Sequence, residues 1–270
     1  MLRNFAAMIA VWLFASAALA ETGLTRLDTG DDSRGWEAVG RLDLDGHGYC
    51  TATLIAVDRV LTAAHCLYDK RTGKRVALSR IEFLAGLRNG RAAAYRGVRR
   101  AVLPPDYVYG QPASAGQVRH DLALLELQHP IRNRRIVPFG TDARPRKGGR
   151  IGVVSYARGR SEAPSLQKVC EVLARQQGVL VMSCDADFGA SGAPVFSFRS
   201  GVPRVVSVVS AMARAGGNKV SLGTDLQQPL AGLRAALAAG AGVLQDDAPQ
   251  FSAVGARRDT GAHFARPGGS

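Results

Sequence analysis

Short apolar or alternating runs, separated by Gly, Asp, Pro and charged residues, make up most of the chain. The runs predicted to be strands in the first half span residues 36–42, 49–57, 59–63, 81–85, 97–103 and 122–127. Those in the second half span residues 136–140, 151–156, 166–173, 178–184, 194–198 and 205–210. Many short strands with frequent turns and little helical periodicity predict an all-β barrel or sandwich.

The first twenty residues have a different pattern. Arg3 precedes a nearly uninterrupted apolar run over residues 5–19, and small residues end it at Ala20. A positive start, a short apolar core and an Ala-x-Ala end are typical of a secretory signal peptide, with cleavage before Glu21. The run is short for a membrane span. We therefore expect an exported protein, secreted or periplasmic, with no stable membrane anchor.

Three further segments also depart from the strand pattern. Residues 21–35 are polar and rich in Gly and Asp, which predicts a flexible lead-in. Leucines recur at helical spacing within residues 225–239, which predicts a helix. Residues 241–270 are rich in Gly and Ala with few apolar anchors, which predicts a disordered tail. Polar insertions at 68–75 and 106–119 are expected to be surface loops.

Charge and cysteine content limit the possible partners. The formal net charge is +13, or +12 once Arg3 is removed with the signal peptide. The basic residues are scattered and no nucleic-acid motif accompanies them, so a solvated Arg-rich surface is the preferred interpretation and no nucleic-acid partner is expected. Four cysteines in an exported chain allow three pairings. No CxxC or His cluster supports a metal, and no cofactor is predicted.

Three motifs carry the chemistry of the chain. Residues 187–194 read DFGASGAP, residues 60–66 read VLTAAHC, and residues 120–127 read HDLALLEL. They closely resemble the serine, histidine and aspartate motifs of the trypsin-like (chymotrypsin-fold) serine protease family. Their order along the chain, His then Asp then Ser, is also that of chymotrypsin.

The resemblance implies a catalytic triad of His65, Asp121 and Ser191. A serine hydroxyl needs a base to take its proton, a carboxylate to orient that base, and donors for the developing oxyanion. His65 would be the base, Asp121 its orienting carboxylate, and the backbone amides of Gly189 and Ser191 the oxyanion donors.

The same resemblance implies the architecture of the chain. The family has two packed, antiparallel, six-stranded β-barrels with the active site between them. Here the first barrel would span residues 36–135 and the second residues 136–240, including a C-terminal helix packed on the second barrel. It also implies a disulfide between Cys50 and Cys66, which leaves one between Cys170 and Cys184.

Substrate-binding residues follow by the same comparison. Ser210 matches a serine that begins the strand binding the substrate backbone, and Ala211 and Met212 would line the pocket beside it. Asp185 lies six residues before Ser191, the separation at which trypsin keeps the aspartate of its specificity pocket, so it would favour substrates with Arg or Lys. Asp185 is alternatively a turn residue, and Asp187 is a second acid competing for the pocket role.

One position departs from the trypsin pattern. Ala190 stands where trypsin has an aspartate that pairs with a newly cut Ile or Val amino terminus, and no Ile-Val-Gly-Gly start lies near residues 21–40. In this respect the chain is closer to bacterial exported branches such as the glutamyl endopeptidases. Activity is therefore expected without such a cut.

These features predict an exported, monomeric serine endopeptidase that hydrolyses protein or peptide substrates through an acyl-enzyme on Ser191. The alternative is a catalytically silent binding protein on the same fold. An esterase of the α/β-hydrolase class is disfavoured because the serine comes last in the chain.

Overall fold

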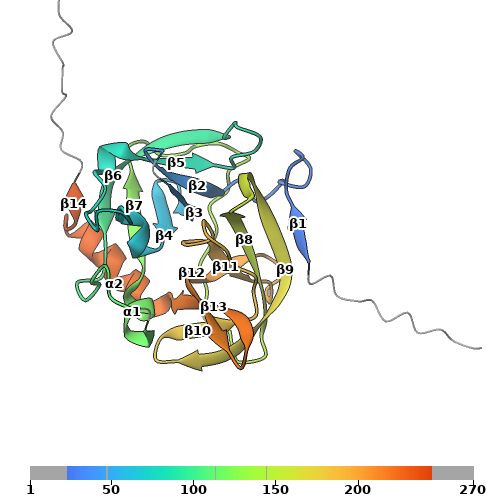
Figure 1. The fold of residues 1–270 in the computed structure, drawn as a ribbon. Helices are drawn as coiled ribbons and strands as arrows, with labels where there is room; N and C mark the ends of the chain where they lie inside the picture. Colours follow the sequence, from blue (N-terminus) through green and yellow to red (C-terminus); the bar gives the residue numbers. More distant parts are fainter. Residues whose placement is uncertain (1–22, 47, 113, 144, 245–270) are drawn as a thin grey trace, which may run out of the picture.

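The computed structural model describes residues 23–46, 48–112, 114–143 and 145–244. The predicted signal peptide and nearly all of the predicted tail lie outside the described residues. The described chain folds into two β-barrels that lie side by side (Figure 1). Among its helices, none is both long and apolar enough to cross a membrane.

The first barrel is a closed sheet of six antiparallel strands. Its hydrogen-bonded order is β6-β5-β2-β3-β4-β7, and pairing of β6 with β7 closes it. The strands are β2 (Val39–Leu44), β3 (Tyr49–Ala56), β4 (Arg59–Thr62), β5 (Ile81–Ala85), β6 (Ala94–Val102) and β7 (Ala123–Leu127). Two short 3-10 helices, η1 (Ala64–Leu67) and η2 (Leu78–Arg80), lie between β4 and β5.

The second barrel has the same construction. Its order is β9-β10-β13-β12-β11-β8, and pairing of β8 with β9 closes it. The strands are β8 (Arg150–Ala157), β9 (Arg160–Gln176), β10 (Val179–Met182), β11 (Pro194–Ser197), β12 (Arg204–Ala215) and β13 (Asn218–Asp225). The predicted all-β fold with two six-stranded barrels is confirmed.

Each barrel gains one short strand from the opposite end of the chain. β1 (Leu24–Arg26) pairs with β9 of the second barrel, and β14 (Val243–Leu244) pairs with β6 of the first. Part of the segment expected to be a flexible lead-in is therefore hydrogen-bonded into a sheet. The polar sequence of this segment did not predict a strand, because a strand added at the edge of a sheet needs backbone hydrogen bonds rather than apolar side chains.

The C-terminal helix α2 (Gln227–Ala238) lies within the predicted range but packs on a different barrel from the one expected. Leu230, Leu233 and Leu237 are buried in the core that includes the first barrel, and α2 contacts β6 and β7. The Arg100 guanidinium on β6 also donates to the carbonyl oxygen of Leu237 at 3.2 Å. The expectation of packing on the second barrel is therefore wrong, because the leucine stripe of α2 is buried against the first.

Three local predictions also differ from the structure. Residues 136–140 form no strand; Ile136 and Phe139 are instead buried in the larger hydrophobic core as packing residues. β13 was not predicted, because its polar start concealed a strand that is hydrogen-bonded between β10 and β12. The predicted loop at 106–119 contains most of a short helix, α1 (Ala115–His120), whose first turn is capped by the side chain of Ser114.

Aromatic packing and one buried hydroxyl join the two barrels. Ring centroids of Trp36 and Phe139 lie 5.1 and 4.7 Å from that of Phe196 on β11. Thr51 on β3 accepts a hydrogen bond from the backbone N–H of Tyr156 on β8 at 3.0 Å. These contacts fix the two barrels relative to one another.

Candidate active site

His65 and Asp121 meet in the first barrel although 56 residues separate them. His65 lies on η1, directly after β4, and Asp121 lies between α1 and β7. The Asp121 carboxylate accepts from the backbone N–H of His65 at 2.8 Å and lies 2.7 Å from its Nδ1. Asp121 is only 4% exposed, so its carboxylate is shielded from water, while the His65 ring remains partly exposed. The arrangement fixes the ring and leaves Nε2 for a second partner.

Ser210 supplies a further donor to the same carboxylate. It lies on β12, and its hydroxyl donates to Asp121 Oδ2 at 2.5 Å across the two barrels. Ser210 was predicted to lie beside the substrate, and its side chain also holds Asp121. A buried carboxylate with three hydrogen-bonding partners is held in one orientation.

The loop carrying Ser191 is held by backbone hydrogen bonds at both ends. Ala190 N–H donates to Asp187 O at 2.9 Å, and Gly192 N–H donates to Val209 O at 2.8 Å. The carbonyl oxygen of Ser191 accepts from Thr51 N–H at 2.8 Å. The Ser191 loop of the second barrel is thus tied to a strand of the first.

Two glycines in this loop are required by both conformation and space. Gly189 and Gly192 have φ values of 97° and 79°, which non-glycine residues rarely adopt. A Cβ on Gly189 would lie 2.5 Å from the Tyr49 ring, and one on Gly192 would lie 2.2 Å from the Thr51 carbonyl oxygen. Side chains at either position would push the loop away from β3.

The amides expected to bind an oxyanion have no partner in the described part of the chain. Neither the N–H of Gly189 nor that of Ser191 donates a hydrogen bond to a described residue. The Gly189 carbonyl oxygen, in contrast, accepts from the Thr51 hydroxyl at 2.9 Å. Thr51 was missed by sequence reasoning, and its only signal was a polar residue inside the apolar strand after Cys50.

A small pocket of about 110 Å³ lies beside Ser191. Its lining comprises Lys70, Ala186, Asp187, Phe188, Ser191, Val209, Ser210, Ala211 and Met212. The predicted substrate-binding residues of β12 are therefore brought together with the predicted nucleophile.

Asp185 does not line this pocket, although the trypsin comparison suggested that it would. Its carboxylate pairs with Lys219 at 2.9 Å, and both side chains are about half exposed. Its amide donates to the Gln167 side chain at 2.8 Å. Asp187 is the acid that lines the pocket.

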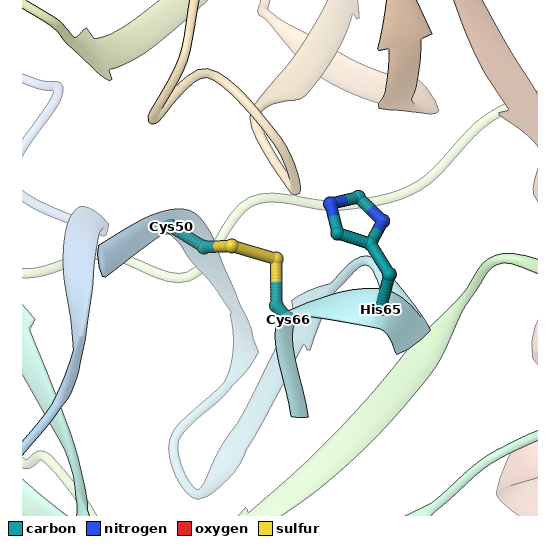
Figure 2. Close-up of side chains that lie close together, drawn as sticks. All are labelled: Cys50, His65 and Cys66. Atoms are coloured by element: carbon teal, nitrogen blue, oxygen red, sulfur yellow. A yellow bond between two sulfur atoms is a disulfide. The ribbon is translucent and has the colours of Figure 1, made fainter. Parts of the chain in front are cut away.

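Both predicted disulfides are present. Cys50 bonds to Cys66 and Cys170 bonds to Cys184. Figure 2 shows the first of these linking β3 to η1 directly beside the His65 side chain. Cys50, Cys66 and His65 have potential metal ligands within 4.8 Å of one another, but the two sulfurs are bonded together and supply no thiolate.

Comparisons with known proteins agree with this geometry. The chain is 32% identical over 164 residues to Serine protease 23 of Bos taurus, covering 54% of this chain and 43% of that protein. Serine protease 23 of Homo sapiens is 31% identical over 165 residues, with 54% and 42% covered. The chain thus spans less than half the length of these curated relatives.

A solved structure, titled as a Glu endopeptidase in complex with MPD, has the same fold. Its TM-score is 0.65 at 17% identity, and the alignment covers 80% of this chain and 97% of that one. The profile of the trypsin-like peptidase domain matches residues 50–206, more than half of the chain and a range containing all three motifs. The chain therefore belongs to the trypsin-like peptidase domain family.

Proposed function

We propose that this protein is a serine endopeptidase that hydrolyses peptide bonds through an acyl-enzyme on Ser191. The observation that carries the proposal is the buried Asp121 carboxylate, which is hydrogen-bonded to both the backbone and the ring of His65. The same carboxylate holds Ser210 on the strand that borders the Ser191 pocket. A carboxylate, an imidazole and a serine loop arranged across two barrels support acyl transfer by the triad mechanism.

Each group has one task in the proposed reaction. His65 takes the proton of Ser191 as the hydroxyl attacks the scissile carbonyl, and then gives it to the leaving amine. Asp121 orients the ring and stabilises the imidazolium. The N–H groups of Gly189 and Ser191, which have no partner among the described residues, would bind the oxyanion. Water then hydrolyses the acyl-enzyme with His65 acting as base.

Activity should not depend on a newly cut Ile or Val amino terminus. Ala190 is fully buried in the apolar core of the second barrel and has no carboxylate to receive an ammonium group. The loop is held instead by Thr51 and by the Gly192 to Val209 hydrogen bond.

Export to the periplasm or the exterior is the compartment we propose, in line with the bacterial exported branch of the family. Two disulfides support an oxidising environment. The apolar segment over residues 5–19 supports passage through a secretory route. Protein or peptide substrates and a monomeric state complete the proposal.

The test combines active-site labelling with cleavage-site profiling of the purified mature protein. A fluorophosphonate should label wild type but not Ser191→Ala, and a peptide library should yield discrete cleavage sites. A protein that is folded but neither labelled nor active would be a silent binding protein on the same fold, and the proposal would be wrong.

A further inference from the structure

A wide groove of about 820 Å³ begins at His65 and Gly189 and runs over the Cys50–Cys66 disulfide. It is separate from the small pocket of Ser191, but Lys70 and Phe188 line both. Phe188 is 52% exposed, so a large aromatic face stands at the border between them. A chain lying across the proposed active site would therefore pass from the small pocket over Phe188 into the groove.

The far wall of the groove is an ordered hairpin. Residues 68–75 close with a bridge between Tyr68 and Arg75, and Asp69 N–H donates to the carbonyl oxygen of Lys74 at 2.9 Å. Val76 N–H then donates to Leu67 O at 2.9 Å, which ties the hairpin to η1. The side chains of this segment are therefore presented from a fixed backbone next to His65.

The groove is strongly basic. Its six cationic side chains belong to Lys70, Arg71, Lys74, Arg75, Arg80 and Arg158, and the only carboxylate among its described lining residues is that of Asp69. That carboxylate is already used, because it accepts from Arg71 N–H at 2.8 Å and Thr72 Oγ1 at 3.0 Å. These bonds lower the pKa of Asp69, the Arg71 amide contributing most, so one negative charge is retained there.

Most of these cations are not neutralised within the protein. Arg80 pairs with Asp45, but the other five form no ion pair with any carboxylate in the described ranges. Arg158 lies over the Phe188 ring at 4.4 Å and Lys70 at 5.7 Å, while Arg75 lies over Tyr68 at 5.4 Å. Stacking on aromatic faces positions the cations without cancelling their charge. An unneutralised cluster on a concave surface attracts anionic ligands.

The position of the groove indicates which part of a substrate it would contact. In the triad mechanism the histidine gives its proton to the leaving amine, so the residues after the scissile bond depart on the histidine side. His65 and Gly189 line the groove, while the strand residues Ser210, Ala211 and Met212 line only the other pocket. The groove is therefore on the leaving-group side.

From this position and charge we infer that the groove is a binding site for acidic residues that follow the scissile bond of the substrate. The inference rests on the proposed peptidase function, and it names a specificity separate from that of the small pocket. Exposed ion pairs contribute modestly one at a time, but several unpaired cations can act on the same one or two carboxylates. We expect a preference of about five- to tenfold in kcat/KM for two acidic residues over their amides at low salt.

The test uses peptides that are identical up to the scissile bond and then carry either Asp-Glu or Asn-Gln. The acidic peptide should be the better substrate at low salt, and the advantage should shrink as ionic strength rises because the charges are screened. The double variant Arg71→Glu/Lys74→Glu should remove or reverse the preference. The matched control Arg132→Glu/Arg134→Glu changes two exposed arginines outside the groove and should retain it. Equal rates for the two peptides in the wild type would overturn the inference.

Two further measurements separate this inference from the proposed function. A chromogenic anilide with no residue after the scissile bond reports the peptidase alone; if it is cleaved while the acidic preference is absent, only the groove assignment fails. The second measurement requires no turnover: fluorescence anisotropy monitors the binding of a labelled Asp-Glu peptide to the Ser191→Ala variant. If the peptide binds in a salt-sensitive way and the added Arg71→Glu/Lys74→Glu substitutions abolish that binding, the groove binds acidic residues even in a protein without activity. Absence of binding to Ser191→Ala would contradict the groove assignment.

Discussion

Substitution of Thr51 tests whether the first barrel holds in place the loop that carries Gly189 and Ser191, the proposed oxyanion donors. Its hydroxyl lies 2.9 Å from the carbonyl oxygen of Gly189 and 3.2 Å from that of Tyr156, and it accepts from Tyr156 N–H at 3.0 Å. Thr51 and Tyr156 are fully buried, so water cannot replace these bonds. The single hydroxyl proton serves one carbonyl at a time, and Gly189 is the closer acceptor.

Thr51→Val keeps the shape of the side chain and removes the hydroxyl. It leaves the Tyr156 N–H and the Gly189 carbonyl without their partner, and an unpaired buried polar group costs about 1–3 kcal/mol. Some relaxation of the loop reduces the total, so we expect the free energy of unfolding to fall by about 2 kcal/mol. For a protein of this size that corresponds to a melting temperature lower by about 4–8 °C.

The same substitution should affect catalysis. If the Gly189 carbonyl is released, the Gly189–Ala190 peptide can rotate. The backbone torsions at Gly189 then change, and the adjoining Phe188–Gly189 peptide, which carries the Gly189 N–H, loses its alignment with the oxyanion. Complete loss of one such donor costs about a hundredfold or more in kcat, so a misaligned donor should cost about tenfold. KM should change much less, because the donor acts mainly in the transition state.

Thr51→Ser is the matched control because it retains the hydroxyl and loses only a methyl group. Loss of that methyl should cost about 1 kcal/mol of stability and leave kcat near the wild-type value. The assays are thermal denaturation and steady-state cleavage of one peptide by both variants. Equal kcat values and melting temperatures for the valine and serine variants would show that the Thr51 hydroxyl does not hold the loop.

Four other outcomes are expected. Ser191→Ala should lower kcat by about four to six orders of magnitude with an unchanged melting temperature, and wild-type turnover by this variant would contradict the mechanism. Replacing both Cys170 and Cys184 with Ala should lower the free energy of unfolding by about 3 kcal/mol in urea denaturation, while an unchanged midpoint would exclude that contribution. A recombinant chain beginning at Glu21 should be active without further cutting; one that stays inert until cleaved between residues 21 and 40 would refute the role given to Ala190. Asp185→Ser should leave the relative rates on Arg, Glu and Leu substrates unchanged, because Asp185 pairs with Lys219 outside the pocket, and a lost preference for Arg would contradict this.

Local sequence patterns were sufficient for the parts of this protein that depend on neighbouring residues. Apolar runs such as residues 81–85 and 151–156 fall within observed strands, since a strand buried on one or both faces needs apolar residues along its length. The leucine spacing of α2 was visible for the same reason. The motifs around His65, Asp121 and Ser191 were recognisable because each is a short segment whose backbone must take one conformation.

Tertiary structure decided the contacts that join distant residues. Ser210 reaches Asp121 across 89 positions and Thr51 reaches Gly189 across 138, and neither pairing leaves a periodic signal in the sequence. Lys219 neutralises Asp185 from a strand that sequence reasoning missed. The leucines of α2 indicated a buried face but not the barrel that buries it. Packing also brought Arg158 of the second barrel beside the basic hairpin of residues 68–75, because local patterning specifies which face is apolar while chain topology determines which side chains meet.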